Sequence, residues 1–561
     1  MYLDFLVDIP DEKGKITFKK KGNAVYVNYE YGRVYDPDRK FNIPQRATIG
    51  KQSKADAGKM QPNQNYVMYF PGVSLPEEKY DSKRCSLLRV GTQMVVDKVI
   101  EENGLREIVS EHFGKNLGLL LDLATYSIVT ERNVGQYYPD YAYNHALFTD
   151  GMRIYSDSKV SDFLREITVD QTVGFLNEWN KDRPHKDRIY ISYDSTNKNC
   201  HAGDLEMAEF GHAKVDVGAP IINLSMAYDT QNKVPLFYEE YPGSINDVSQ
   251  FQSMVAKAQG YGYKNIGFIL DRGYFSKENI EYMDACGYSF VMMVKGMASF
   301  VSELVLSRQG EFEKNWDNNV RKYSVYGTTV KKKLYVTDER DRYFHIFHNP
   351  YKEAAQRDDV EEKIERMEKF LQKKQWTAYE PSAVVEQYFE LIYSSDGALS
   401  AFRVKKDVVE RELRLCGYFV IVTSEEMTAS EAIELYKSRD TSEKLFAMDK
   451  TFLGNRSFRT YTNEATASKI FIEFIALIIR CKIYTCIKAE AERLENRPNY
   501  MNVPAAIKEL EKIEMIRGYD NVYRLDHAVT ATQKTILGAF NITENDVKKK
   551  AQRISERLKN A

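Results

Sequence analysis

The chain is poor in cysteine, and its few cysteines are scattered. Six occur in 561 residues, and no C-x-x-C pair is among them. Disulfide-stapled domains and tetrahedral zinc sites both need cysteines at short, regular spacings. The sequence therefore argues against both and predicts free or buried thiols in a reducing compartment.

Long apolar runs and a basic N-terminal leader are also missing. The first residues, MYLDFLVDIPDEKGK, carry acids where a secretory signal needs cations. The most apolar segment, residues 470–479, is too short to span a bilayer and contains Glu473. We expect a cytoplasmic protein with no membrane partner, and a buried core helix at residues 470–479.

Net charge is almost absent, because 79 basic and 81 acidic residues leave −2. A surface for a polyanion would therefore have to be local. Residues 1–60 have such a local excess, with twelve basic against eight acidic side chains, and residues 16–51 alternate like short strands. Two interpretations stay open for this stretch: contact with a nucleic-acid backbone and bases, or a surface β-module of ordinary charge.

The length predicts several domains, and the composition is that of soluble globular protein. Apolar periodicity predicts a mixed α/β chain with five regions. They are a basic β-rich module (1–85), a helical region (86–185), a strand–helix core in two parts (186–296 and 415–490), a mixed α/β insertion (297–414), and a helical tail with a basic end (491–561).

The segment TASEAIELYKSRDTSEKLFAMDK, residues 428–450, has the signals of a helix. Thr428 and Glu431 form a capping box at its start. Four polar side chains then follow the spacing Y-x2-R-x3-E-x6-K: Tyr436, Arg439, Glu443 and Lys450. On a helix these positions lie near one face. By itself this face also suits solvent, with an Arg439–Glu443 ion pair.

Two aspartates upstream favour a functional role for the polar face of that helix. RIYISYDSTN places Asp194 at the end of an alternating strand, and NIGFILDRGY places Asp271 at the end of a buried one. Strand ends meet helices packed across them, so both aspartates can converge with Glu443. Three carboxylates suit Mg²⁺ or Mn²⁺, and two such ions assist in-line phosphoryl transfer. Each aspartate alone is also a usual turn residue.

These segments together resemble the DDE transposases of bacterial insertion sequences, in the group with a Tyr-Arg-Glu-Lys signature. ISYDST with the strand pair and Pro-Gly turn after it resembles the first-Asp block, and ILDRGYFSKENI resembles the second. GYFVIVTS and SFRTYTNEATASKIFIEFIALII resemble the flanks of the Glu helix, and the stretch from Val27 to Lys51 resembles the start of one long-form subgroup. The resemblance covers most of residues 20–490.

The resemblance implies a ribonuclease H-like fold with an insertion before the Glu helix. It implies Mg²⁺, with Mn²⁺ as a substitute, held by Asp194, Asp271 and Glu443 as catalytic residues. It further implies a homodimer that acts at the bacterial nucleoid and pairs two transposon ends, with their terminal inverted repeats and target DNA as partners. DNA contacts would come from Tyr436, Arg439, Lys450, Lys444 and Arg456.

Three functions remain open on the sequence. The first is a transposase that cleaves transposon ends and joins their 3′-hydroxyls to target DNA. The second is a ribonuclease H-like nuclease without strand transfer. The third is a domesticated DNA-binding protein, against which the complete set of Asp194, Asp271 and Glu443 argues. The DNA-reading module stays open between the basic β-rich stretch and a helix-turn-helix-like arrangement in residues 86–185.

Overall fold

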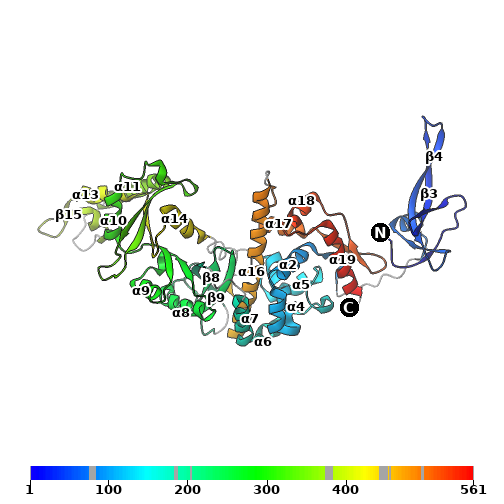
Figure 1. Cartoon of the computed structure of the whole chain (residues 1–561), viewed down its shortest axis with the longest axis horizontal. Helices are drawn as coiled ribbons and strands as arrows, with labels where there is room; N and C mark the ends of the chain where they lie inside the picture. Colours follow the sequence, from blue (N-terminus) through cyan, green and yellow to red (C-terminus); the bar gives the residue numbers. More distant parts are fainter. Residues whose placement is uncertain are drawn as a thin grey trace. The chain divides into compact units, whose positions relative to one another are not determined.

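The computed structural model describes residues 2–74, 84–181, 188–201, 205–372, 383–440, 453, 457–494 and 498–559. The chain forms two compact units. The first comprises Met1–Gln171, Phe452–Gly454 and Ala467–Ala561, and the second comprises Thr172–Thr451 and Asn455–Thr466. Among the helices of the described residues, none has the length and apolar character that a membrane span needs. The predicted mixed α/β class is confirmed (Figure 1).

The second unit is built on a 10-stranded sheet in the order β12-β13-β14-β17-β11-β10-β7-β8-β9, with β18 paired to β7. Its strands are β7 (Ile189–Cys200), β8 (Ile221–Asp229), β9 (Val234–Pro242), β10 (Ile266–Leu270), β11 (Ser289–Met293), β12 (Asn319–Val320), β13 (Val325–Lys332), β14 (Arg342–His348), β17 (Tyr418–Thr423) and β18 (Ser457–Phe458).

The centre of this sheet is mixed. β7, β10 and β11 are parallel, whereas β8 and β9 follow β7 as antiparallel neighbours. Helices α8 (Asp247–Gly260) and α9 (Lys277–Ala285) make the crossovers into β10 and β11. Both start at side-chain caps, since Asn246 accepts from Ser249 N and Ser276 accepts from Asn279 N.

Part of the expected insertion, residues 297–414, extends this same sheet. The β13–β14 hairpin pairs through β14 with β17, and β17 pairs with β11. The remaining elements of this range are α10 (Ala298–Arg308), α11 (Pro350–Gln372), α12 (Ala383–Tyr388), β15 (Phe389–Tyr393), β16 (Leu399–Val404) and α13 (Lys406–Leu415). All of these except α10 contribute to a small core of their own, centred on Leu371, Val385, Tyr388 and Phe389.

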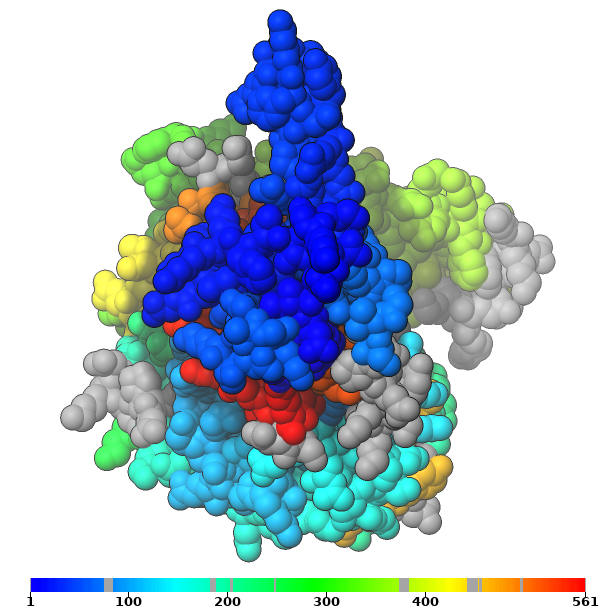
Figure 2. All heavy atoms as spheres, turned by 90° about the vertical axis from the view of Figure 1, so that its right-hand side faces the viewer, coloured from blue at the N-terminus to red at the C-terminus, as the bar shows by residue number. Residues whose placement is uncertain are grey.

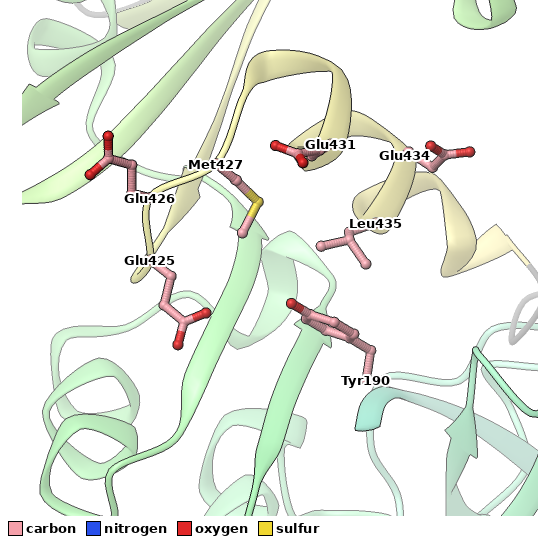
Figure 3. A pocket seen from close by; sticks show the side chains of 7 residues that line it. All are labelled: Tyr190, Glu425, Glu426, Met427, Glu431, Glu434 and Leu435. Atoms are coloured by element: carbon pink, nitrogen blue, oxygen red, sulfur yellow. The ribbon is translucent and has the colours of Figure 1, made fainter. Parts of the chain in front are cut away.

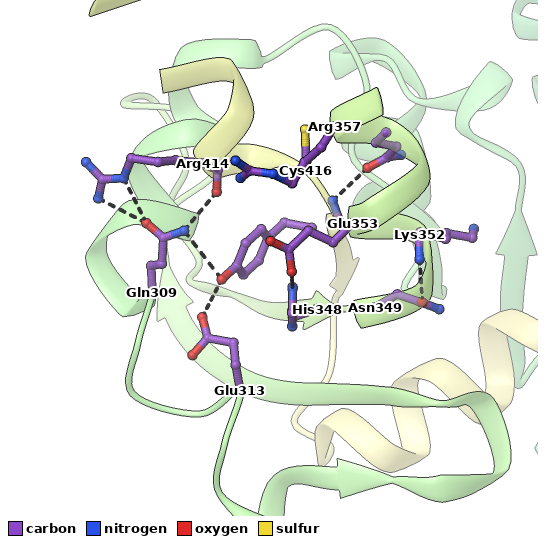
Figure 4. A network of polar contacts seen from close by, with 12 residues as sticks. Gln309, Glu313, His348, Asn349, Lys352, Glu353, Arg357, Arg414 and Cys416 are labelled. Carbon is purple, nitrogen blue, oxygen red and sulfur yellow. Dashed lines mark hydrogen bonds and ion pairs between the residues drawn. The ribbon is translucent and has the colours of Figure 1, made fainter. Parts of the chain in front are cut away.

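Polar contacts join this small subdomain to the sheet (Figure 4). Tyr418 of β17 donates its hydroxyl to Glu313 Oε1 at 2.6 Å. His348, at the end of β14, lies 2.9 Å from Glu353 Oε2 on α11. Gln309 Nε2 donates to the Arg414 carbonyl oxygen at 2.8 Å. These bonds fix where the chain leaves and rejoins the sheet.

The first unit opens with a five-stranded sheet in the order β1-β5-β4-β3-β2. Its elements are β1 (Val7–Asp8), β2 (Ile16–Lys21), β3 (Ala24–Asp36), β4 (Phe41–Gln52), β5 (Lys59–Pro62) and the helix α1 (Gln64–Tyr69). Val27, Ile49, Met60 and Tyr66 pack beneath it with Val7. The short strands predicted for residues 16–51 are present, but β3 and β4 are long.

The rest of the first unit is mainly helical, as predicted for much of residues 86–185 and for the tail. The helices are α2 (Gly91–Glu102), α3 (Leu105–Phe113), α4 (Leu117–Thr130), α5 (Tyr138–Tyr143), α6 (Asp157–Glu166), α16 (Asn463–Arg493), α17 (Val503–Leu510), α18 (Ala531–Gly538) and α19 (Glu544–Lys559). Helix α7 (Val169–Lys181) belongs mostly to the second unit, which begins at Thr172. A small sheet of β6 (Leu87–Arg89), β19 (Glu514–Arg517) and β20 (Tyr523–Leu525) joins tail and helical region. The buried helix expected at residues 470–479 is confirmed.

Candidate active site

Asp194 and Asp271 are neighbours on adjacent parallel strands. The β7–β10 register pairs Tyr193 with Leu270. Asp194 is the residue after Tyr193, and Asp271 is the residue after Leu270. Side chains alternate along strands, so both aspartates lie on the face opposite the Tyr193 ring. That face is covered by α14 (Ala429–Ser438), which packs on Val291 and Ile421.

The prediction that Asp194 ends its strand is wrong. β7 continues to Cys200 because β8 pairs with it as far as Asn199. What ends at Asp194 is the parallel neighbour, since β10 stops at Leu270. The carboxylate therefore projects from a continuous strand at the point where the sheet loses one partner. A main chain held on its β8 side fixes the side chain more firmly than a loop would.

Four neighbouring groups act on the pKa of the Asp194 carboxylate. The pKa of Asp194 is raised to about 6, mainly by burial and in smaller part by the charge of Asp271. The Ser195 backbone N–H, which donates to Asp194 Oδ1 at 2.9 Å, lowers this pKa, as do the cations Arg439 and Lys214. Two carboxylates and two cations therefore act on one another at the Asp194 site.

Arg439 reaches this pair from the C-terminal end of α14. Its Nη1 lies 3.7 Å from Asp271 Oδ1, and its side chain is only 11% exposed. A cation is favoured at a helix C-terminus, where carbonyl dipoles point outward. The predicted capping box at the other end is confirmed, because Thr428 accepts from Glu431 N and Glu431 accepts from Thr428 N. Sheet packing and capping together fix where Arg439 lies.

Tyr436 has a mainly apolar environment. It is 5% exposed and belongs to the cluster that contains Ile433 and Ile421. The Arg439 guanidinium lies 5.4 Å from the centre of the Tyr436 ring. The two residues do share one face, as predicted, but the Tyr436 side of that face is turned towards the sheet. The alternative of a wholly solvated face is therefore wrong for the described part of the helix.

Four predicted site residues lie outside the residues that the structure describes: Glu443, Lys444, Lys450 and Arg456. Within the described ranges, no group of three or more His, Cys, Asp or Glu side chains is arranged to hold a metal ion. The described part of the site thus supplies two carboxylates of the three that the sequence predicts. Asp194 and Asp271 offer hard oxygen donors side by side, and this pair fits one edge of a Mg²⁺ or Mn²⁺ site.

Lys214 is a residue of this site that sequence reasoning missed. Its Nζ donates to the Ser195 carbonyl oxygen at 2.8 Å. Asn197 holds the Lys214 segment in place, because it accepts from Lys214 N at 3.0 Å and donates to the His212 carbonyl at 2.8 Å. Asn199 bonds to Asp216 in the same way. The alternating asparagines of STNKN were the available signal, since they share one face of β7.

A pocket of about 400 Å³ near the N-terminal end of α14 is lined by four glutamates (Figure 3). Each carboxylate already has a partner. Glu425 pairs with Arg188 at 2.5 Å, Glu434 pairs with Lys322, Glu426 accepts from the Tyr343 hydroxyl, and Glu431 belongs to the capping box. Each of these carboxylates is thus engaged within the protein, and a pocket lined by four acids does not suit a phosphate.

Residues 190–479 match the protein family described as "Transposase DDE domain". No curated protein matches the chain. A piggyBac transposase synaptic complex with hairpin DNA is similar at 9% identity and a TM-score of 0.33, over 84% of this chain and 82% of that one. A Mos1 transposase paired-end complex with the left transposon end is similar at 8% identity and a TM-score of 0.14, over 40% of this chain and 65% of that one. Both TM-scores are too low for these likenesses to bear on the fold.

Proposed function

Since this chain belongs to the transposase DDE domain family, we propose that it cleaves transposon ends and joins their 3′-hydroxyls to target DNA by metal-dependent phosphoryl transfer. The observation that carries the proposal is the register of β7 and β10, which makes Asp194 and Asp271 neighbours. Arg439 lies against this pair, so an acidic centre with an adjacent cation faces the approaching phosphate.

We infer that the core of the second unit is ribonuclease H-like. Three antiparallel strands (β9, β8, β7) continue into two parallel ones (β10, β11), and α14 crosses the face that carries the aspartates. That order supports the assignment, and the β17–β14–β13 strands are then an addition to its edge.

In this proposal Asp194, Asp271 and Glu443 hold Mg²⁺ or Mn²⁺. When bound, such ions lower the pKa of an attacking water or hydroxyl and neutralise charge on the leaving oxygen. Asp194 must then be ionised, and Lys214 and Arg439 favour that state because their charges lower its pKa. Burial at this position keeps the dielectric low and strengthens each of these interactions.

The cations next to the aspartates would hold the DNA backbone. Arg439 can bind a phosphate with a bidentate fork, and Lys214 can bind one as a point charge. Lys450, Lys444 and Arg456 follow as further DNA contacts from the sequence pattern. Tyr436 has a different part in this proposal, since its ring supports the Arg439 guanidinium from below. A homodimer would pair two ends, with terminal inverted repeats and target DNA as substrates at the nucleoid.

Plasmid cleavage tests the proposal directly. A supercoiled plasmid carrying the DNA that flanks the gene is incubated with protein and Mg²⁺, and nicked, linear and strand-transfer products are separated. Asp194→Asn should abolish cleavage and leave end binding intact, because the charge that holds the ion is lost while the side-chain shape is kept. Asp396→Asn, an exposed turn residue on the small subdomain, is the matched control.

Each outcome decides between the candidate functions. Cleavage by Asp194→Asn at the wild-type rate would contradict the metal-site assignment. Cleavage by the wild-type protein without any joined product would favour a nuclease without strand transfer. End binding without cleavage by the wild-type protein, with either Mg²⁺ or Mn²⁺, would favour a domesticated DNA-binding protein.

A further inference from the structure

The β3–β4 hairpin of the first unit extends well beyond the small core of its sheet (Figure 1, Figure 2). β2 pairs with β3 only over residues 24–29, and β5 pairs with β4 only over residues 50–52. Within the described residues, the part of β3 from Gly32 onward pairs with β4 alone. We call residues 32–45 the ribbon. None of its side chains is buried.

We propose that this ribbon is a DNA-reading arm that enters the major groove of duplex DNA. The inference rests on the proposed function and adds to it the surface that contacts DNA outside the active site. A two-stranded antiparallel ribbon is one of the two elements that fit the major groove, which is about 12 Å wide. Five paired positions, from Gly32–Gln45 to Asp36–Phe41, give the ribbon a length of roughly 15 Å.

Charge is the first argument for DNA as the partner. Residues 16–52 carry eight basic side chains and three acidic ones, in a chain whose net charge is −2. Two of the three acids are engaged within the hairpin. Glu30 is 7% exposed and pairs with Arg33 at 2.7 Å and Arg46 at 3.2 Å, and Asp36 accepts from two backbone N–H groups of the turn. The surface left for a partner is therefore positive.

The two faces of the ribbon give the second argument. Register pairs Tyr35 with Asn42, which places both on one face together with Arg33. Arginine and asparagine are the side chains that read guanine and adenine by paired hydrogen bonds in the major groove. The other face carries Val34 and Phe41, which are 53% and 52% exposed.

Those exposed apolar groups need a partner to cover them. A two-stranded ribbon with neither face packed is only marginally stable in water, and Tyr35 is 59% exposed as well. Thymine methyl groups in the major groove offer apolar contact. The open backbone edges of the ribbon can donate N–H groups to phosphates, as DNA-contacting strands do. Duplex DNA thus satisfies the charge, the polar face and the apolar face at once.

Fluorescence anisotropy with the full chain tests this inference. The probes are a labelled duplex of random sequence and a labelled duplex taken from the DNA that flanks the gene, each titrated over a series of salt concentrations. The charge variant is Arg39→Gln with Lys40→Asn, in which asparagine suits the positive φ of 54° at position 40. The face variant is Tyr35→Ser with Asn42→Ser. Melting temperatures confirm folding, since all four positions are exposed.

A control with the same loss of charge is available on α11. Arg366 and Lys369 are exposed and already paired with Glu362 and Glu365. The double change Arg366→Gln with Lys369→Gln should leave both affinities near wild type. The ribbon charge variant should weaken binding of both duplexes roughly tenfold and lower the salt slope by about 1 to 2. The face variant should lose affinity for the flanking duplex more than for the random one.

The outcomes separate this inference from the proposed function. Wild-type affinity in both ribbon variants, with plasmid cleavage intact, would overturn the ribbon assignment and leave the transposase proposal standing. If the α11 control lost as much duplex affinity as the ribbon charge variant, the loss would reflect total charge alone, and the ribbon assignment would also be overturned. A ribbon variant that changes the oligomeric state without DNA, at unchanged affinity, would assign the ribbon to self-association instead. Failure of the wild-type protein to bind any duplex would count against the proposed function itself.

Discussion

Lys214 lies beside a predicted metal ligand without belonging to any motif. It reaches the site because two asparagines of β7 fasten the loop that carries it. Its Nζ bonds to the carbonyl of the residue after Asp194, so its charge is held close to that carboxylate. At the residue scale, the site is therefore made of an acid pair from the sheet, a cation from a helix end and a cation from a loop.

Lys214→Met removes this charge and keeps most of the aliphatic stem. We expect plasmid cleavage to slow roughly tenfold to a hundredfold, because a fixed cation next to the reacting phosphate is lost. Single-turnover rates on the flanking-DNA plasmid measure the effect. Lys264→Met, at an exposed position between α8 and β10, is the control. A wild-type rate for Lys214→Met would assign the lysine to loop structure alone.

The capping box in the first turn of helix α14 stabilises the helix as far as its C-terminal end, where Arg439 lies. The capping box satisfies backbone N–H groups that the helix cannot satisfy by itself. We expect Thr428→Ala to cost about 1 kcal/mol of local stability, and Thr428→Ser to cost little, because serine keeps the hydroxyl. Amide hydrogen exchange over residues 429–438 measures the difference. Unchanged exchange in the alanine variant would mean that packing on the sheet alone holds the helix.

His345 connects three strands of the sheet from a fully buried position. Its ring nitrogens lie 2.9 Å from Thr329 Oγ1 and 3.0 Å from Thr423 Oγ1. Thr423 donates its own proton to the Glu425 carbonyl, so it accepts from His345 Nε2–H. Burial lowers the pKa of His345 from 6.5 to about 4, and the charge of Glu431 opposes this only in part.

The sign of the resulting pH dependence follows from that shift. The unfolded chain takes up a proton on His345 below pH 6.5, whereas the folded chain does so only near pH 4. The stability that this residue contributes is therefore full above pH 6.5 and falls as the pH drops from 6.5 towards 4, by about 3 kcal/mol in all. His345→Gln keeps a donor and an acceptor but does not titrate. Its melting temperature should fall less on acidification than that of the wild type, and parallel curves would contradict this.

The whole molecule should respond to divalent cations even without DNA. If the aspartates hold Mg²⁺ or Mn²⁺, binding to the folded state alone stabilises it by about 2 to 3 kcal/mol at a hundredfold excess over Kd. Melting temperature with and without Mn²⁺ measures this. The shift should be present in the wild type and in Asp396→Asn, and absent in Asp194→Asn. A shift in all three proteins would place the ion elsewhere.

Local signals predicted more of this protein than long-range pairing did. The capping box at Thr428 depends on residues within one turn, and its prediction was correct. Asp271 follows a short buried run, so its strand end was readable as well. Asp194 was placed at a strand end because the alternation stops there, but β7 continues through its pairing with β8, which no local pattern contains.

The same reason explains two omissions. Lys214 reaches Asp194 only through side-chain bonds between β7 and a loop, and such contacts leave no periodicity in the sequence. The sequence assigned the β13–β14 hairpin to an insertion, because its alignment beside β17 depends on residues about 75 positions apart. The predicted third ligand, Glu443, lies outside the described residues, and its role stays a prediction.

The junction between β14 and β17 has a consequence for how this protein can change over time. His348 and Tyr418 are register partners, and Asn349 N donates to the Gly417 carbonyl at 2.9 Å, so the chain departs and returns at a single place. Gly417 has a φ of +84°, and a Cβ there would press on Glu353 and the Asn349 carbonyl. The described elements between these anchors, from α11 to α13, form the small subdomain outside the large sheet. Because both ends of the subdomain are fixed at this one place, evolution can change its length or content without displacing a strand of the large sheet. A foreign domain can be grafted between the same two ends.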